Sequence, residues 1–401
     1  MLPTLLAAFL LQAAPPEEPK DFWTRDTILG DLGGVRTDLE AGGLRWSLLY
    51  TGEIMSNVHG GLERDTGVDM LLDWVIDADF QKMLGWTGGS ARINPLWIAG
   101  DGISEDVGDL TKVSNISARG GVRVFEAWVQ QVLLDGGLSL RAGIMGADQE
   151  FAISPSSLLM FNSSFGAPIF LSGNLSWPIY PLGDLGFRVR CEPAKGFYLM
   201  GAVFEGDAGA EQFNRSGLNV RLRNGDGLFA IGGAGWTFDD QLTGMVKIGG
   251  FYHSADFIEF STGKPVSGLG GGYAVLDKRI YKEGPIPGAL DFHLRFGFAQ
   301  EDRAQISFGM STGLKSTGTI PGRDADVLGI GWIYARISDD FADAQPDPGS
   351  WSYESVIEVT YQFFITPAWS FQPDIQYVMH PGGSSATRNA TVIGIRVDLS
   401  F

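Results

Sequence analysis

The last nine residues of the chain alternate apolar and polar side chains without a break. Apolar residues occupy positions 393, 395, 397, 399 and 401, and glycine, arginine, aspartate and serine stand between them. A period of two over about ten residues is typical of a tilted β-strand that meets lipid on one face and water on the other. The sequence therefore predicts a membrane-spanning strand here, closing on Phe401.

The same alternation recurs upstream, over residues 44–51, 292–299, 328–335, 357–363 and 369–379. Trp351 and Trp369 stand where such segments end, as in the interfacial girdles of membrane barrels. Tight turns such as residues 366–368 alternate with long polar loops such as residues 380–389. A two-sheet sandwich would not place tryptophans on the outward ends of its strands. We therefore predict an all-β fold, a transmembrane antiparallel β-barrel of about sixteen strands whose water-filled lumen is too wide for side chains to fill.

The N-terminal part of the chain has a different pattern. Residues 2–11 form a short apolar run that small residues and a proline-rich stretch follow, which predicts a signal peptide over residues 1–14. Residues 15–43 are predicted to be an N-terminal periplasmic segment with a short helix over residues 33–41, and residues 44–401 the barrel. Since no later run of about 18 apolar residues exists, no membrane-spanning helix is predicted.

Composition agrees with this architecture and excludes several functions. Glycine supplies 56 of 401 residues and aromatic residues 12%, which suits strands and turns, because glycine costs about 1 kcal/mol inside a helix. A net charge of −18 would repel a phosphate backbone, so no nucleic-acid partner is expected. Cys191 is the only cysteine, which excludes an intramolecular disulfide and a multi-cysteine zinc site. The four histidines show no ligand spacing, so neither a metal nor a cofactor is predicted.

Several motifs, in order along the chain, resemble the OprB family of carbohydrate-selective porins. Residues 26–39 follow the pattern D-T-x-x-G-D-W-G-G-x-R-T-x-L, with Leu32 where the family has tryptophan. Residues 123–131 resemble a later hairpin strand of the family, and residues 372–377 its closing hairpin. The resemblance implies sixteen antiparallel strands, passive diffusion of glucose and other small sugars, and a place in the bacterial outer membrane.

The resemblance and the predicted barrel together suggest partners. Small carbohydrates would pass through the lumen, while outer-membrane lipid and lipopolysaccharide would surround the wall. The C-terminal strand would engage the barrel-assembly machinery. Family members often form homotrimers, an assembly that nothing in these residues indicates.

A sugar pore needs side chains that replace water around hydroxyl groups, and preferably an aromatic face for the ring, while binding stays weak. The polar rows of the early strands supply such groups. The candidate pore-lining, substrate-binding residues are Arg45, Glu53, Arg92, Arg123, Glu126, Trp128, Gln130 and Arg141. We expect arginine–carboxylate pairs to line the constriction and Trp128 to offer a platform to the sugar. The alternative for each is a structural role in the lumen.

Other functions stay open at this stage. A general or anion-preferring diffusion porin would be favoured by a lumen dominated by unpaired arginine. An outer-membrane barrel hydrolase is suggested by residues 309–313, which match G-x-S-x-G, although no helix pattern follows them. A mainly structural barrel would have its lumen occluded by loops. We predict a passive channel without catalytic residues.

Overall fold

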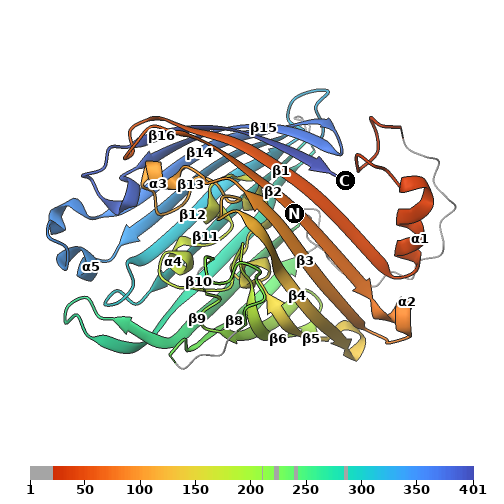
Figure 1. The fold of residues 1–401 in the computed structure, drawn as a ribbon, viewed down its shortest axis with the longest axis horizontal. Helices are drawn as coiled ribbons and strands as arrows, with labels where there is room; N and C mark the ends of the chain where they lie inside the picture. Colours follow the sequence, from red (N-terminus) through yellow and green to blue (C-terminus); the bar gives the residue numbers. More distant parts are fainter. Residues whose placement is uncertain (1–20, 210, 221–224, 239–242, 284–287) are drawn as a thin grey trace.

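A single closed barrel accounts for most of the chain. The computed structural model describes residues 21–209, 211–220, 225–238, 243–283 and 288–401. In these residues sixteen antiparallel strands each pair with their neighbours in sequence, and β1 pairs with β16 to close the ring (Figure 1). The strands are β1 (Leu44–His59), β2 (Thr66–Asp79), β3 (Gly89–Ala99), β4 (Gly121–Leu133), β5 (Leu138–Met145), β6 (Asp184–Ala194), β7 (Phe197–Glu205), β8 (Leu228–Phe238), β9 (Gly244–Ile258), β10 (Pro265–Lys282), β11 (Ala289–Ala299), β12 (Ile306–Thr317), β13 (Val327–Ile337), β14 (Tyr353–Thr366), β15 (Trp369–Met379) and β16 (Ala390–Ser400). The predicted barrel of about sixteen strands is confirmed.

The alternating apolar and polar residues of each strand form the outer and inner faces of the wall. On β16, Ile393 and Ile395 are more than two-fifths exposed on the outer face, whereas Val392 and Arg396 point inward and are buried. Trp74 and Trp236 are likewise exposed on the outside. Because a closed barrel pairs the backbone of every strand, such a wall can lie in lipid with its apolar side chains outward.

The two ends of the barrel differ. At one end, here called the short-turn end, residues 134–137, 195–196 and 367–368 connect strands directly. The N-terminal segment also lies there, since the Ile28 amide donates to the carbonyl of Ser400 at 2.7 Å. Figure 1 shows α1, α2 and the C-terminus at this end and α3 and α5 at the opposite, long-loop end.

The helices are short. The α-helices are α1 (Val35–Ala41), α2 (Phe80–Leu84), α3 (Ser104–Val107), α4 (Ile169–Ser172) and α5 (Asp339–Asp343), and the 3-10 helices are η1 (Leu32–Gly34), η2 (Leu134–Gly136), η3 (Ala147–Gln149), η4 (Pro155–Leu159), η5 (Ser163–Phe165), η6 (Pro348–Ser350) and η7 (Pro381–Gly383). Among the residues described, no helix is long and apolar enough to cross a membrane. The helix predicted over residues 33–41 corresponds to α1, whereas the predicted signal peptide lies outside the described residues.

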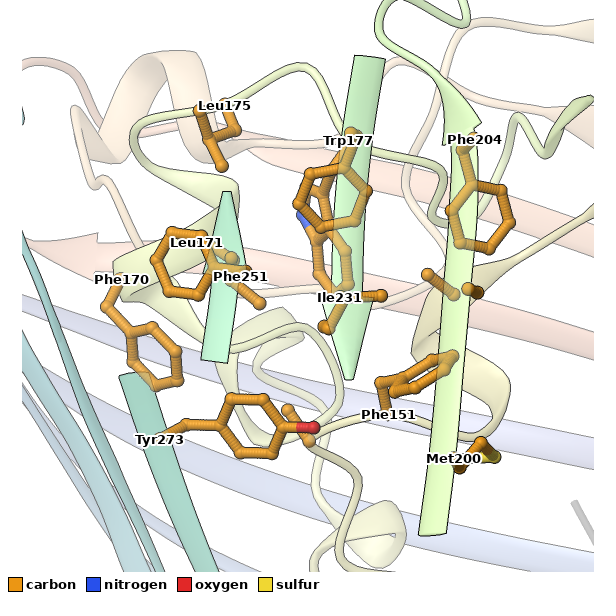
Figure 2. Close-up of a cluster of buried hydrophobic side chains, with 14 of the residues drawn as sticks. Phe151, Phe170, Leu171, Leu175, Trp177, Met200, Phe204, Ile231, Phe251 and Tyr273 are labelled. Carbon is orange, nitrogen blue, oxygen red and sulfur yellow. The ribbon is translucent and has the colours of Figure 1, made fainter. Parts of the chain in front are cut away.

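Two connections at the long-loop end turn inward and occupy much of the lumen. We call residues 146–183, between β5 and β6, the inner segment, and residues 100–120, between β3 and β4, the second segment. Figure 2 shows aromatic side chains of the inner segment packed on those of the wall. The buried cluster contains Phe151, Phe170, Leu171 and Trp177 from the segment and Phe204, Ile231, Phe251 and Tyr273 from β7–β10. The lumen is therefore filled in part by inserted chain, which a period-two pattern does not reveal, and not by water alone as predicted.

Glycines on the inner face of the wall leave room for the inner segment. A Cβ atom at Gly297 on β11 would lie 2.5 Å from the Phe170 ring, and one at Gly309 on β12 would lie 2.7 Å from the Ile169 side chain. Any larger residue would displace the segment, because interiors pack without spare volume. These lumen glycines make room for inserted chain rather than for a wide passage.

Candidate functional site

Two cations on the wall hold the inner segment by its carbonyl groups. Lys247 on β9 donates from Nζ to the carbonyls of Glu150 and Ile153 at 3.0 and 3.2 Å. Arg295 on β11 is buried and donates from Nη1 to the carbonyl of Gly166 at 2.9 Å. Because the segment has little regular structure, these side chains satisfy backbone groups that a helix or sheet would otherwise pair.

Two carboxylates hold the same segment by its amide groups. Asp277 on β10 accepts from the amide of Ser156 at 2.7 Å and from its hydroxyl at 2.8 Å. Glu358 on β14 accepts from the amides of Phe161 and Asn162 at 2.6 and 3.0 Å. The wall from β9 to β14 therefore holds the segment by hydrogen bonds, whereas the partly exposed side chains of Arg45 and Arg92 lie on the facing wall, β1–β6.

Besides Arg123 on β4, five arginines point inward from that facing wall, and we call these five the arginine belt. They are Arg45 on β1, Arg92 on β3, Arg141 on β5, and Arg188 and Arg190 on β6. The register pairs Arg92 with Asp77 and with Trp128, and Arg141 with Gln130 and Arg188, so the belt is continuous from strand to strand.

The first part of the belt centres on a carboxylate of β2. Arg92 contacts Asp77 through two parallel bonds, Nε to Oδ1 at 2.7 Å and Nη2 to Oδ2 at 3.0 Å. Arg45 lies 3.5 Å from the same carboxylate, and its side chain is 52% exposed. The paired geometry fixes the Arg92 plane, since a bidentate contact constrains the guanidinium in two directions.

The second part of the belt stacks on an aromatic ring. The guanidinium carbon of Arg141 lies 3.9 Å from the centre of the Trp128 ring, and that of Arg92 lies 5.5 Å from it. Gln130 Oε1 accepts from Arg141 Nε and Nη2 at 3.1 and 2.9 Å and from Arg188 Nη2 at 3.0 Å. Ring and amide together hold the arginines in fixed planes, because cation–π contact and hydrogen bonds restrict the same groups.

Glu150 joins the inner segment to the belt across the lumen. Its carboxylate accepts from Arg188 Nε at 2.9 Å and lies 3.6 Å from Arg141 Nη1, while its carbonyl accepts from Lys247 on the other wall. Burial alone would raise the pKa of Glu150, but Arg141 and Arg188 outweigh it, so its pKa lies below the ordinary value. Glu150 is therefore ionised at neutral pH, and its contacts with Arg141 and Arg188 connect the inner segment to the arginine belt.

The eight candidate residues fall into two groups. Arg45, Arg92, Gln130 and Arg141 face the lumen and keep partly exposed side chains. Glu53, Arg123, Glu126 and Trp128 point to the same side of the wall but are buried, at 7% exposure or less. Other side chains and inserted chain cover these four, so only the first group can touch a passing solute in this arrangement.

Each buried candidate has a contact that explains its burial. Glu53 binds Arg396 on β16, and Arg123 donates to Glu211 at 2.9 Å. Glu126 lies 3.8 Å from Arg92 and accepts from the amide of Gly146 at 3.3 Å. Trp128 is stacked under Arg141, so that face of its ring is not offered to a sugar.

Sequence reasoning missed several members of the site, namely Asp77, Glu150, Arg188 and Arg190. Asp77, Arg188 and Arg190 lie on the lumen parity of their strands, so a systematic count of charged residues on that parity would have found them. Glu150 lies outside every strand, and no periodicity marks it. The candidate hydrolase motif, residues 309–313, lies wholly within β12, and its Ser311 is buried.

A buried acid in the inner segment gives a pH-dependent prediction. Burial raises the pKa of the Asp148 carboxyl from 3.8 to about 7, against a smaller opposing contribution from the Tyr180 amide. Because its folded pKa is the higher one, Asp148 binds a proton on folding, and its burial costs most stability above pH 7. Asp148→Asn should therefore raise the urea midpoint of unfolding in detergent micelles at pH 8 and change it little at about pH 4.

Asp343→Asn, at an exposed position of α5, is the matched control and should leave the midpoint unchanged at both pH values. An equal gain for Asp148→Asn at both pH values would show that the acid's ionisation is not the cause.

Residues 65–401 match the carbohydrate-selective porin family OprB. Porin B of Pseudomonas aeruginosa is 23% identical over 97% of this chain and 93% of its own length. The high-pH structure of Pseudomonas putida OprB is similar with a TM-score of 0.87 at 21% identity, over 95% of this chain and 100% of that one. The low-pH structure of the same protein has a TM-score of 0.63 at 18% identity, over 94% and 99% of the two chains. Both structures share the barrel fold.

Proposed function

This chain belongs to the OprB family of carbohydrate-selective porins, and from that premise we propose that its sugar-selective constriction lies beside the contact of Glu150 with the arginine belt. The protein is a passive, carbohydrate-selective porin. One observation carries the proposal for the constriction. Arg141 and Arg188 on the wall lie 3.6 and 2.9 Å from the carboxylate of Glu150, so the inserted chain meets the wall at a row of fixed donors.

Planar donors held at the edge of a narrow passage suit sugars. Arg141 donates from Nε and Nη2 to Gln130, and Arg92 donates from Nε and Nη2 to Asp77. Nη1 of Arg141 lies 3.6 Å from Glu150 and Nη1 of Arg92 lies 3.8 Å from Glu126, which is longer than a hydrogen bond, so a hydroxyl group can still bind each Nη1. A passing sugar exchanges its water for these donors one or two at a time, which keeps binding weak and transit fast. Trp128 supports the two guanidinium planes from behind and acts as a positioning residue.

The proposal also includes the position of the barrel in the membrane. The apolar outer face would lie in the bacterial outer membrane, with the short-turn end in the periplasm and the long-loop end outside the cell. Glucose and other small sugars are the proposed solutes. Contact with lipopolysaccharide, assembly through β16 and a homotrimeric state stay predictions.

Arg141→Ala tests the constriction directly. Loss of this guanidinium removes both bulk and donors, so ion conductance should rise and the ratio of glucose to disaccharide permeation should fall by at least about two-fold. The measurement is swelling of reconstituted liposomes in glucose, a disaccharide and an amino acid, with single-channel conductance in planar bilayers.

Arg336→Ala is the control, because that arginine lies at the long-loop end and pairs with Asp339. It should leave both measurements at wild-type values. Unchanged sugar permeation and unchanged conductance in Arg141→Ala would place the constriction elsewhere.

A further inference from the structure

The N-terminal segment is held against the outer side of the wall, beside the seam where β1 meets β16. The guanidinium carbon of Arg36 in α1 lies 4.1 Å from the centre of the Trp46 ring, and Arg36 Nη1 donates to the Trp46 carbonyl at 3.0 Å. Trp46 has the parity of Ile54 on β1, which is 53% exposed, so its ring points away from the lumen. Because β1 pairs with β16 only from Leu49 onward, α1 binds a carbonyl at a strand edge that β16 leaves free.

One side of α1 is apolar and uncovered. Val35 and Leu39 are four residues apart, so they lie on the same side of the helix, and they are 52% and 36% exposed. Leu32, just before the helix, is 42% exposed. The other side is polar, since Thr37 donates from its hydroxyl to Asp31 at 2.9 Å. Single exposed apolar residues are ordinary, but a contiguous apolar surface indicates a partner.

The apolar surface continues along the short-turn end as far as the turn between β4 and β5. Lys82 of α2 donates from Nζ to the carbonyl of Glu40 in α1 at 3.0 Å. Trp86, which follows α2, donates from Nε1 to Gln131 of β4 at 2.5 Å. Apolar residues that are each at least 36% exposed lie along this path, and we call them the apolar collar: Leu32, Val35, Leu39, Met83, Leu84 and Leu134.

The apolar collar borders the apolar outer face of the wall. Trp46 points outward from β1 at this edge, and Phe80 of α2 stacks on Trp86 with 5.2 Å between the ring centres. Aromatic rings at the edge of a membrane barrel lie where lipid headgroups meet acyl chains. Figure 1 shows α1 and α2 at the short-turn end, next to the ends of β1 and β2. A helix with one apolar side at that level is placed to lie in the plane of the interface.

We propose that the apolar collar lies in the periplasmic leaflet of the outer membrane, where phospholipid headgroups meet acyl chains, and attaches the N-terminal segment and the seam to the lipid surface. The inference rests on the proposed function, which sets the barrel in the membrane, and adds phospholipid as the partner of this surface. Lipid fits better than a second copy or a water-soluble partner, because the collar is continuous with the wall that lipid covers. Asp38 and Glu40 of α1 are exposed, so apolar contact, and not attraction to anionic headgroups, holds the helix there.

The test uses the full chain in vesicles of phosphatidylethanolamine and phosphatidylglycerol. Cys191 is the only cysteine, so Cys191→Ser gives a background in which a single label can be placed. Val35→Cys and Leu84→Cys carry an environment-sensitive fluorophore on the collar. Ala41→Cys is the matched control, because Ala41 is exposed on the other side of α1. Phospholipid with a nitroxide at carbon 5 of its acyl chain should quench the two collar labels at least about three-fold more than the control.

Ile395→Cys reports the position of the barrel itself, because Ile395 is 43% exposed on the outer face of β16. Phospholipid with a nitroxide at carbon 12 should quench this label. Quenching at Ile395 but not at Val35 and Leu84 would overturn the collar and leave the membrane position standing, whereas no quenching at any of the three would overturn both.

Two further results would overturn the collar. Equal quenching of the collar labels and the Ala41 label would mean that α1 has no lipid-facing side. Collar labels that aqueous iodide cannot reach and lipid nitroxides do not quench would mean that a second copy or another protein covers the surface. The constriction is judged separately, by the effect of Arg141→Ala on the permeation of neutral sugars.

Discussion

Replacing residues 147–182 by a linker of about four glycine and serine residues is expected to raise single-channel conductance at least about three-fold. Met145 and Asp184, which flank the segment, are neighbours in the register of β5 and β6, so a short linker can join them. The wall would remain closed, because its strands pair with one another and not with the segment. The anchoring side chains Lys247 and Arg295 would be hydrated by the water that enters.

Bilayer conductance and uptake of maltose-series oligosaccharides measure this result. The widened pore should pass a trisaccharide at a rate close to that of glucose, whereas the wild type should discriminate between them. Heat-dependent migration on gels and the strand signal in circular dichroism would show that the barrel is intact. An intact barrel with wild-type conductance would mean that the second segment, and not the inner one, limits flow.

A milder variant tests whether conductance depends on the presence of the inner segment or on its fixed position. Arg295→Met removes a donor to the main-chain carbonyls of the segment but keeps the chain in the lumen. Buried carbonyls that lose a charged donor cost about 1–3 kcal/mol, so the segment should open more often without leaving. We expect noisier conductance with a modest rise in its mean.

The barrel could be predicted from sequence because its signal is local. Side chains of a strand alternate with a period of two, and one apolar face is required wherever lipid surrounds the wall, so residues 393–401 already show the pattern. The inner segment carries no such period. Its position depends on contacts with β9–β14, such as the Asp277–Ser156 bond between residues far apart in the chain, and no short window of sequence contains both partners.

The same distinction explains the candidate residues. Arg92, Arg141 and Glu53, three of the candidate pore-lining residues, lie on the inner side of their strands. Parity does not tell whether a lumen residue meets water or inserted chain, which is why Glu53 is 1% exposed and Arg92 keeps 22% of its side chain exposed. The strands therefore determine which side chains point inward, and the two inserted segments determine which of these side chains meet water.

Arg396→Met should destabilise the closed barrel by about 3–5 kcal/mol, because it leaves the Glu53 carboxylate buried without its cation. The two residues face each other in the register of β1 and β16, where the ring closes. Arg396 Nε donates to Glu53 Oε1 at 2.6 Å, and Ser114 of the second segment donates to Oε2 at 2.7 Å. The pair therefore joins the seam of the barrel to inserted chain.

Urea unfolding in micelles, followed by tryptophan fluorescence, measures the loss. Arg190→Gln is the control, since its partner Glu192 lies 3.5 Å away and both are about one-third exposed, so its loss should cost under about 1 kcal/mol. The double variant Glu53→Gln with Arg396→Met should recover part of the stability, because no unpaired charge stays buried. A double variant as unstable as the sum of the singles would mean that the two side chains act independently, and that closure depends on the backbone pairing of β1 and β16 alone.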